Sequence, residues 1–92
     1  MTDDWAETLA LQVLTHILAD PDLCGRFLNL TGLAPGDLPS RVTDIHFLGA
    51  VLNFLLSDEP QLVEFCSAMQ VDPHQPARAR RLLQGNHAPE WD

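Results

Sequence analysis

The chain has 92 residues, 46% of them hydrophobic, and a formal net charge of −8 that arises from 13 acidic residues, five arginines and no lysine. This length predicts one domain, residues 1–92, and the apolar fraction argues against disorder. No run of about 18 apolar residues is present and the acidic first residues differ from a signal peptide, so we expect a cytoplasmic protein without membrane contact. The negative charge repels phosphates, which disfavours nucleic acid as a partner.

The first two predicted helices are separated by a clear start signal. Apolar residues between positions 5 and 19 fill an arc of about 200° on a helical wheel, which predicts a largely buried helix. Asp20 followed by Pro21 is typical of an N-cap and a first helical position, and Gly32 is typical of the residue that ends a helix. We therefore expect a second helix up to about Thr31. Its predicted inner face consists of Leu23, Cys24, Phe27, Leu28 and Leu30.

The stretch over residues 33–43 interrupts the helical pattern. Pro35 suits a helix start, whereas Pro39 would remove a hydrogen bond inside a longer helix. A short helix around residues 35–42 is consistent with both prolines, and its length stays open.

The second half of the chain has the same organisation. Residues 44–57 again fill an arc of about 200° and predict a central buried helix. Asp58 is the expected N-cap of a helix over residues 59–70, and Asp72 starts a further helix over residues 73–84. The predicted inner faces of these last two helices contain Leu62, Phe65, Cys66, Met69, Ala79, Leu82 and Leu83. Residues 1–4 and 86–92 show no periodicity, and we expect them to form flexible tails.

Six identities recur at a constant spacing of 38 residues. The pairs are Val13/Val51, Leu14/Leu52, Leu18/Leu56, Asp20/Asp58, Phe27/Phe65 and Pro35/Pro73. Self-similarity at a fixed period predicts a supersecondary unit that is used twice. We therefore predict an all-α fold: a compact bundle of five or six short helices made of two tandem helical hairpins. The helices over residues 5–19 and 44–57 should form its centre.

Residues that could carry out catalysis or hold a metal are scattered. The histidines lack the close pairs that zinc sites use, and the chain has neither a glycine-rich phosphate motif nor a nucleophile elbow. Asp58 and Glu59 could be paired catalytic carboxylates, but their position at a helix start favours capping. We expect no catalytic residue, no metal and no cofactor, and so a protein that is not an enzyme. The four histidines are His16, His46, His74 and His87.

Two cysteines, Cys24 and Cys66, lie on predicted apolar helix faces. Buried thiols behave as small hydrophobic side chains, whereas a redox sensor would need an exposed and electropositive setting. The sequence favours the buried position for both.

One basic cluster stands out, formed by Arg78, Arg80 and Arg81. On a helical wheel Arg78 and Arg81 lie on one side, while Arg80 projects elsewhere. Cations in a last helical turn interact favourably with the helix dipole, and ion pairs with the acidic surface are equally ordinary. The functional alternative is a small anion or phosphate patch that contacts RNA or a phosphorylated partner.

Three segments resemble a known family. They are Leu23 to Pro35, Phe47 to Glu59, and Val71-Asp72-Pro73 together with Ala79-Arg80-x-Leu82. These segments are similar to a small alphaproteobacterial family of about ninety residues that is described only as a domain of unknown function. The resemblance implies an all-helical fold in a bacterial cytosol. It transfers no active site, since the matching residues mainly pack and cap helices, and Pro39 departs from the family pattern.

The surplus of apolar residues suggests an interaction function. Two wide apolar helices in so small a chain could leave an exposed groove or a self-association surface. We therefore predict a non-catalytic protein–protein interaction or regulatory module that binds a protein partner or a second copy. Its surface is expected at Phe47 and Leu48, on the outer edge of the helix over residues 44–57, and at Trp91, which could instead dock on its own domain. The alternative is a weak nucleic-acid or phosphate-binding regulator that uses the three clustered arginines.

Overall fold

A computed structural model describes residues 4–85 of the chain. These residues form six α-helices and one short 3₁₀ helix, and the described part contains no strand. The all-α prediction is therefore confirmed. The elements in chain order are α1 (Asp4–Leu18), α2 (Pro21–Thr31), η1 (Pro35–Asp37), α3 (Leu38–Arg41), α4 (Ile45–Leu56), α5 (Glu59–Met69) and α6 (His74–Gly85).

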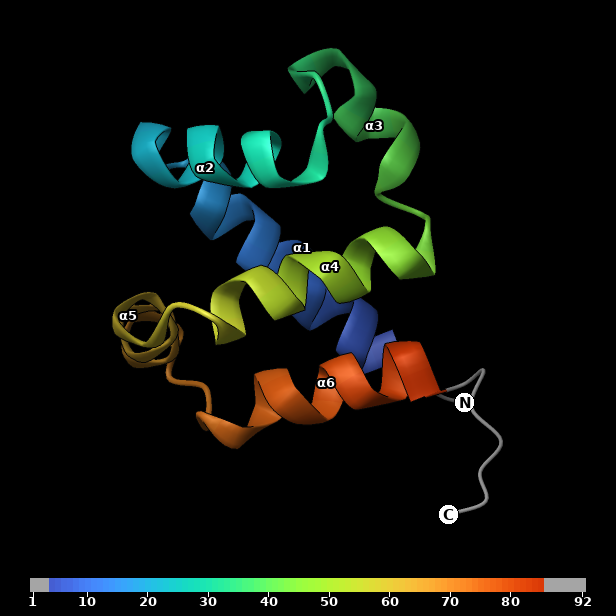
Figure 1. The fold of residues 1–92 in the computed structure, drawn as a ribbon. Helices are drawn as coiled ribbons and strands as arrows, with labels where there is room; N and C mark the ends of the chain where they lie inside the picture. Colours follow the sequence, from blue (N-terminus) through green and yellow to red (C-terminus); the bar gives the residue numbers. More distant parts are fainter. Residues whose placement is uncertain (1–3, 86–92) are drawn as a thin grey trace.

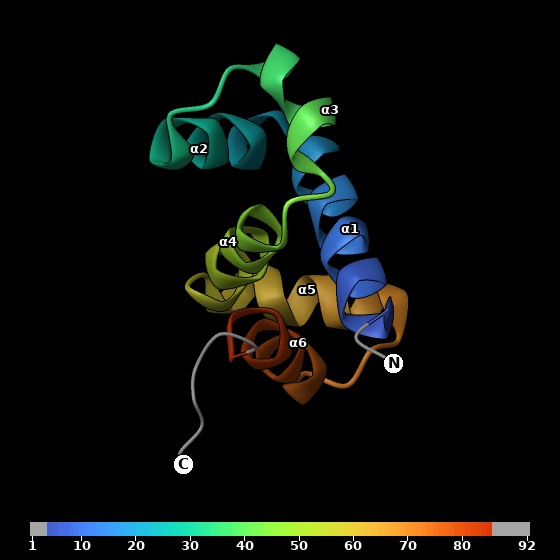
Figure 2. The ribbon, with the colours of Figure 1, turned by 90° about the vertical axis from the view of Figure 1, so that its right-hand side faces the viewer.

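The helices are arranged around α1 and α4. In both ribbon views α2 and α3 lie at one end of the molecule and α5 and α6 at the other (Figures 1 and 2). Helix α1 runs along the length of the molecule between the two ends, whereas α4 crosses its middle. Helices α4 and α6 lie side by side and run in opposite directions (Figure 1).

Local capping explains where the helices begin and end. The side chain of Asp20 accepts hydrogen bonds from the amides of Asp22 and Leu23, and Asp44 and Asp58 cap α4 and α5 in the same way. Each cap satisfies amides that have no partner within the helix. Gly32 ends α2 with φ 74°, a left-handed conformation that glycine adopts without a steric penalty. The start signals read from the sequence are confirmed.

The core lies between α1, α4 and α6, and α2 and α5 pack against it with Leu23, Phe27, Phe65 and Cys66. Helix α6 contacts both α1 and α4 extensively, so it is a third central element and not a peripheral one as predicted. The buried hydrophobic side chains are Ala6, Leu9, Ala10, Val13, Leu14, Ile17, Leu23, Phe27, Leu38, Phe47, Leu48, Val51, Leu52, Phe54, Leu55, Phe65, Cys66, Ala79 and Leu83.

Two residues that we predicted on inner faces are exposed. Leu30 is 73% exposed and Met69 is 45% exposed, although both belong to the apolar arcs of their helices. A helical wheel gives the direction of a side chain, but the neighbouring element decides whether that direction is covered. Leu30 lies at the end of α2 where no other helix covers it completely, and this leaves an apolar surface on the molecule.

The internal repeat stays a prediction. Helices α2 and α5 have 11 residues each, follow an Asp cap and end at a left-handed residue, Gly32 or Gln70. The elements that follow them differ, because α3 has four residues whereas α6 has 12 and packs into the core. The two halves of the chain are therefore not packed equivalently.

Candidate functional site

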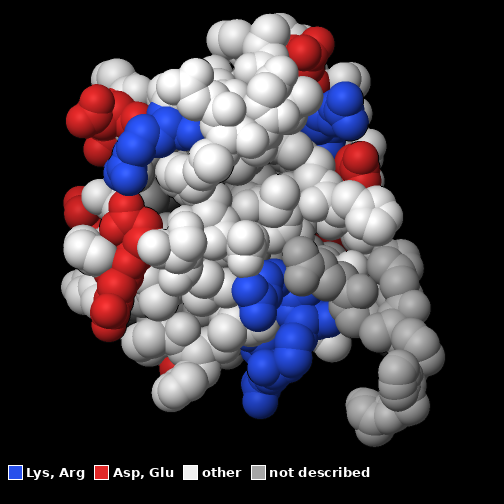
Figure 3. Space-filling view, viewed as in Figure 1, with Lys and Arg blue, Asp and Glu red and all other residues white. Residues whose placement is uncertain are grey.

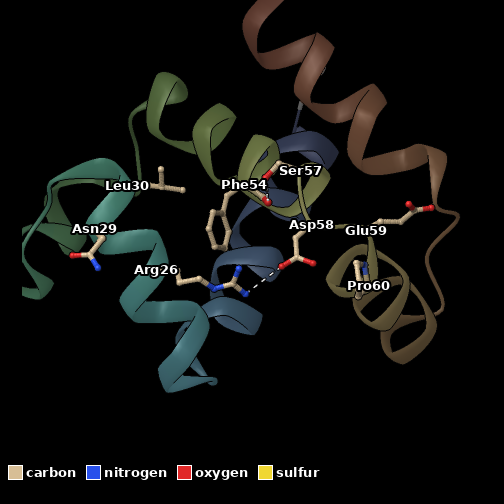
Figure 4. Close-up of a pocket in the computed structure, with 8 residues that line it drawn as sticks. All are labelled: Arg26, Asn29, Leu30, Phe54, Ser57, Asp58, Glu59 and Pro60. Carbon is tan, nitrogen blue, oxygen red and sulfur yellow. Dashed lines mark hydrogen bonds and ion pairs between the residues drawn. The ribbon is translucent and has the colours of Figure 1, made fainter.

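A groove separates α2 from the second half of α4 and the start of α5. It consists of two adjoining hollows of about 510 Å³ and 200 Å³ that share Leu30, Phe54 and Ser57. We call this feature the α2–α4 groove. Figure 4 shows the larger hollow, with Arg26 and Leu30 projecting from α2 toward Phe54, and Asn29 pointing away. The remaining lining residues of the two hollows are Phe27, Thr31, Ala50, Asn53, Asp58, Glu59 and Pro60.

The floor and one wall of the groove are apolar. The ring of Phe54 is largely buried and packs edge-to-face on Phe27, with a centroid separation of 5.3 Å. Leu30 is the most exposed of the large hydrophobic side chains in residues 4–85. A bound apolar side chain could therefore cover Leu30 and the exposed edge of Phe54 at the same time. Removing such surface from water contributes about 25 cal/mol per Å².

An ion pair connects the two sides of the groove at its α5 end. Arg26 Nη2 donates a hydrogen bond to Asp58 Oδ2 at 3.2 Å, and its guanidinium lies 6.0 Å from the ring centroid of Phe54. The second carboxylate oxygen of Asp58 accepts from the amide of Gln61 as the cap of α5. The predicted role of Asp58 as the N-cap of α5 is thus confirmed. The bridge fixes the distance between α2 and α5, although an exposed pair of this kind contributes at most about 1 kcal/mol.

The opposite side of the groove is tied to α6. Ala50, Asn53 and Ser57 follow one another on a single face of α4, at the spacing of one helical stripe. Asn53 Oδ1 accepts a hydrogen bond of 2.8 Å from Arg80 Nη1. The Nε atom of Arg80 is buried and has no hydrogen-bond partner among the described residues. A cationic side chain therefore lies at this edge of the groove, on the side that faces α6.

The arginines of α6 differ from the other two arginines of the chain. Arg26 pairs with Asp58 and Arg41 with Asp44, whereas no ion pair between residues 4 and 85 includes an arginine of α6. All three precede the last turn of α6, so the helix dipole does not explain them as we had suggested. Figure 3 shows one group of basic side chains over α6, apart from the acidic side chains, which lie along the left side and at the upper right of this face.

Arg78 and Arg81 occupy a different face of α6 from Arg80. Together with His74 and the carboxylate of Asp72 they line a hollow of about 410 Å³. Arg80 instead turns toward α4, as its bond to Asn53 shows. The division that the helical wheel predicted is confirmed.

The surface predicted at Phe47 and Leu48 is corrected by the structure. Both side chains are buried, with exposed fractions of 6% and 2%. The ring of Phe27 packs edge-to-face on Phe47 at 5.8 Å and covers the side of α4 that we expected to be open. Trp91, the third residue of that surface, lies outside the described residues.

The sequence reasoning missed the residues that do form an open surface. Leu30 was assigned to the core, and Asn53 was given no role. A usable signal was present in α4, where the small or polar residues Ala50, Asn53 and Ser57 recur at i, i+3 and i+7 within an otherwise apolar helix. Such a stripe marks the one face of a core helix that is not fully covered.

Residues with potential chemistry have structural roles elsewhere. The ring of His16 is half-buried: its Nε2 lies 3.1 Å from Gln61 Oε1, an oxygen that can only accept a hydrogen bond, and the ring packs edge-to-face on Phe65. Cys66 is buried, and this burial together with the charge of Asp72 raises the pKa of its thiol. Cys24 is only half-buried. Within residues 4–85 no three histidine, cysteine or acidic side chains converge on a point that could hold a metal ion.

Comparison with known proteins places the chain in a family. A family model described as a protein of unknown function (DUF3572) matches residues 3–86. The chain belongs to the DUF3572 family. No curated protein and no solved structure matches this DUF3572 chain. None of the helices described over residues 4–85 is long and apolar enough to cross a membrane. The alphaproteobacterial origin that the resemblance implied stays a prediction.

Proposed function

We propose that this DUF3572 protein is a non-catalytic protein–protein interaction module whose binding surface is the α2–α4 groove. The observation that carries the proposal is the exposure of Leu30 beside the ring of Phe54, in a hollow bounded by three helices. Exposed apolar side chains that line a hollow are typical of surfaces that bind another protein. A partner would place an apolar side chain, on a helix or an extended segment, against Leu30 and Phe54.

The polar residues of the groove support binding better than catalysis. Asp58 is engaged by Arg26 and by the amide of Gln61, and the amide oxygen of Asn53 is engaged by Arg80. Groups held in this way fix the walls and orient a ligand, whereas a general base must be free to take a proton from a substrate. This is the structural support for a protein that is not an enzyme.

Net charge favours one kind of partner. The chain has a formal net charge of −8, so two copies repel each other at long range, whereas a partner rich in lysine and arginine is attracted. The exposed carboxylate of Glu59, at the α5 end of the groove, is available for a basic residue beside the apolar anchor. We therefore expect a basic protein partner ahead of a homo-oligomer.

A pair of matched variants tests this proposal. Leu30→Asp places a charge in the groove, and Leu11→Asp places the same charge on an exposed leucine of α1 that is not among the groove's lining residues. Proteins captured by the wild type from the native lysate at low salt should be retained by Leu11→Asp and lost with Leu30→Asp. If the same proteins bind all three chains equally, the groove is not the binding surface.

The unpaired arginines of α6 favour a second candidate function, namely weak binding of phosphate or nucleic acid. Arg78 and Arg81 line a hollow together with Asp72, and neither arginine forms an ion pair within 4.0 Å among the described residues. Binding to phosphocellulose or to an RNA oligonucleotide would then decrease in an R78Q/R81Q variant and not in the R41Q control. Equal binding by both variants would exclude this role.

A further inference from the structure

A second hollow lies where the start of α1 meets the connection between α5 and α6 (Figure 2). It has a volume of about 570 Å³ and shares no lining residue with the α2–α4 groove. We call it the Trp5 hollow, after the ring that lies between Asp4 on α1 and Gln70, Val71 and Asp72 of the connection. We propose that the Trp5 hollow binds the guanidinium group of an arginine on a basic partner protein. The proposal does not depend on the α2–α4 groove.

An aromatic ring gives the hollow its apolar wall. Trp5 is 37% exposed, and Leu9 and Val71 complete the apolar lining beside it. A guanidinium plane that stacks on an indole gains a cation–π attraction, and tryptophan is the aromatic residue that gives the strongest one. The one cation–π contact between residues 4 and 85 joins Arg26 to Phe54. The ring of Trp5 therefore has no cationic partner within that part of the chain.

Two carboxylates line the hollow, whereas no arginine does. Asp72 accepts hydrogen bonds from His74 through Oδ1 alone, so Oδ2 accepts none from the described residues. The bond from the His74 amide is the main cause that lowers the pKa of Asp72, which is therefore charged at neutral pH. Arg78 also lowers this pKa, but it lines the neighbouring hollow and forms no ion pair with Asp72. Asp4 and Asp72 thus make the Trp5 hollow attractive to a cation.

Three glutamines add hydrogen-bond acceptors from three separate elements. Gln12 lies on α1, Gln70 ends α5 and Gln75 lies on α6, and none of their side-chain amides is hydrogen-bonded within residues 4–85. A guanidinium has five N–H donors in one plane, whereas the ammonium of lysine is compact and strongly hydrated. A ring, two carboxylates and several amide oxygens around one hollow therefore suit arginine better than lysine.

The backbone of Gln70 supports a binding role for its side chain. Among residues 4–85 it is the only residue other than glycine with a positive φ, which is 55°. Gly32 ends α2 in the same left-handed conformation without a steric penalty. Strained residues of this kind are concentrated at ligand sites. Gln70→Gly should therefore raise the urea midpoint and at the same time weaken binding, a combination that a purely structural residue would not give.

The test is an NMR titration of the full chain with a blocked tripeptide, acetyl-Gly-Arg-Gly-amide. The indole N–H of Trp5 and the glutamine amides report binding directly. Two control peptides replace the arginine, one by citrulline, which has the same shape without the charge, and one by lysine. The arginine peptide should bind roughly tenfold more tightly than the citrulline peptide and at least about threefold more tightly than the lysine peptide, because only arginine combines charge with a planar donor group.

Three variants of the chain locate the binding site. Trp5→Leu keeps an apolar side chain, and D4N/D72N removes both charges while asparagine can still accept the hydrogen bond of the His74 amide. Each should weaken binding of the arginine peptide at least about threefold, as read from the glutamine amides. The matched control D22N/E64Q removes two carboxylates at exposed positions outside the hollow, and it should leave the affinity within about twofold of the wild type.

Four outcomes would overturn the proposal. Equal affinity of the arginine peptide and either control peptide would show that the hollow does not select a guanidinium. Equal weakening by D22N/E64Q and D4N/D72N would show attraction by net charge and not by a site. Binding that Gln70→Gly and Trp5→Leu leave unchanged would place the peptide elsewhere. Shifts of the Trp5 indole that follow protein concentration without any peptide would show that a second copy covers the hollow.

Discussion

The position of Leu30 can be tested by making one substitution at two sites of one helix. Leu23 and Leu30 both lie on α2, with exposed fractions of 2% and 73%. Leu→Ala at a buried site costs about 2–5 kcal/mol, because burial is lost and a cavity remains. At an exposed site the change stays within about 0.5 kcal/mol, and alanine is at least as good a helix former as leucine. We therefore expect Leu23→Ala to lose at least about 2 kcal/mol and Leu30→Ala almost nothing.

Urea unfolding and thermal unfolding, both followed by circular dichroism, measure this difference as a free energy and as a shift in Tm. A chain of this size has a total stability of about 5–15 kcal/mol, and each kcal/mol shifts Tm by about 4–8 °C. Leu23→Ala should thus lower Tm by roughly 10 °C or more, whereas Leu30→Ala should leave it within about 3 °C of the wild type. Comparable losses for the two variants would show that Leu30 belongs to the core. In that case the α2–α4 groove would be filled, and the proposed binding surface would not exist.

Three further predictions concern the caps, the ion pair and the buried thiol. Asp58→Ala should lower the free energy of unfolding by about 1 kcal/mol, because the N-cap of α5 is lost. A double-mutant cycle of Asp58→Ala with Arg26→Gln should give a coupling energy of about 0.2–1 kcal/mol that decreases in 1 M NaCl. A coupling energy of zero at low salt would contradict the ion pair. The backbone is left-handed at Gly32 (φ 74°) and at Gln70 (φ 55°). Gly32→Gln should therefore destabilise the fold by about 1 kcal/mol, and Gln70→Gly should stabilise it by a similar amount. Changes in the free energy of unfolding that have the same sign for both variants would refute this. Burial raises the pKa of the Cys66 thiol, so the folded protein favours the neutral thiol over the thiolate. The contribution of Cys66 to the free energy of unfolding is therefore fully present below the ordinary thiol pKa and is lost as pH rises through the raised pKa. In a Cys66→Ala variant the stability should therefore decrease less at alkaline pH than in the wild type. A urea midpoint with the same pH dependence in both proteins would contradict this.

The ends of the helices could be predicted from the sequence because they depend on local chemistry. An aspartate that accepts a hydrogen bond from an amide two or three residues later acts within one turn, so Asp20, Asp44 and Asp58 identify their helices without knowledge of the fold. The same holds for Gly32, whose left-handed conformation is a property of that residue alone. These signals place the elements within a residue or two of their observed bounds.

Burial of individual side chains could not be predicted in the same way, because it depends on which element lies opposite. Phe47 was expected on an outer edge, yet the ring of Phe27 covers it, and these two residues are 20 positions apart in sequence. Leu30 was expected inside, yet the chain turns away at Gly32 before another helix can cover it. The candidate site was therefore not predicted from the sequence, because it depends on the same tertiary contacts that decide the burial of these two residues.

The open groove follows from how α6 is held against α4. Helix α6 has a narrow apolar stripe, in which Ala79 and Leu83 are fully buried. The small side chain of Ala79 lets the neighbouring helices approach closely. The rest of α6 is rich in arginine and cannot enter the core, so Arg80 projects along the surface of α4 and binds Asn53. That contact ends the α4–α6 interface at the polar stripe of α4, while the Arg26–Asp58 pair holds α2 on the other side. The space between is left without a helix to fill it, and it leaves exposed the apolar side chains that a partner would cover.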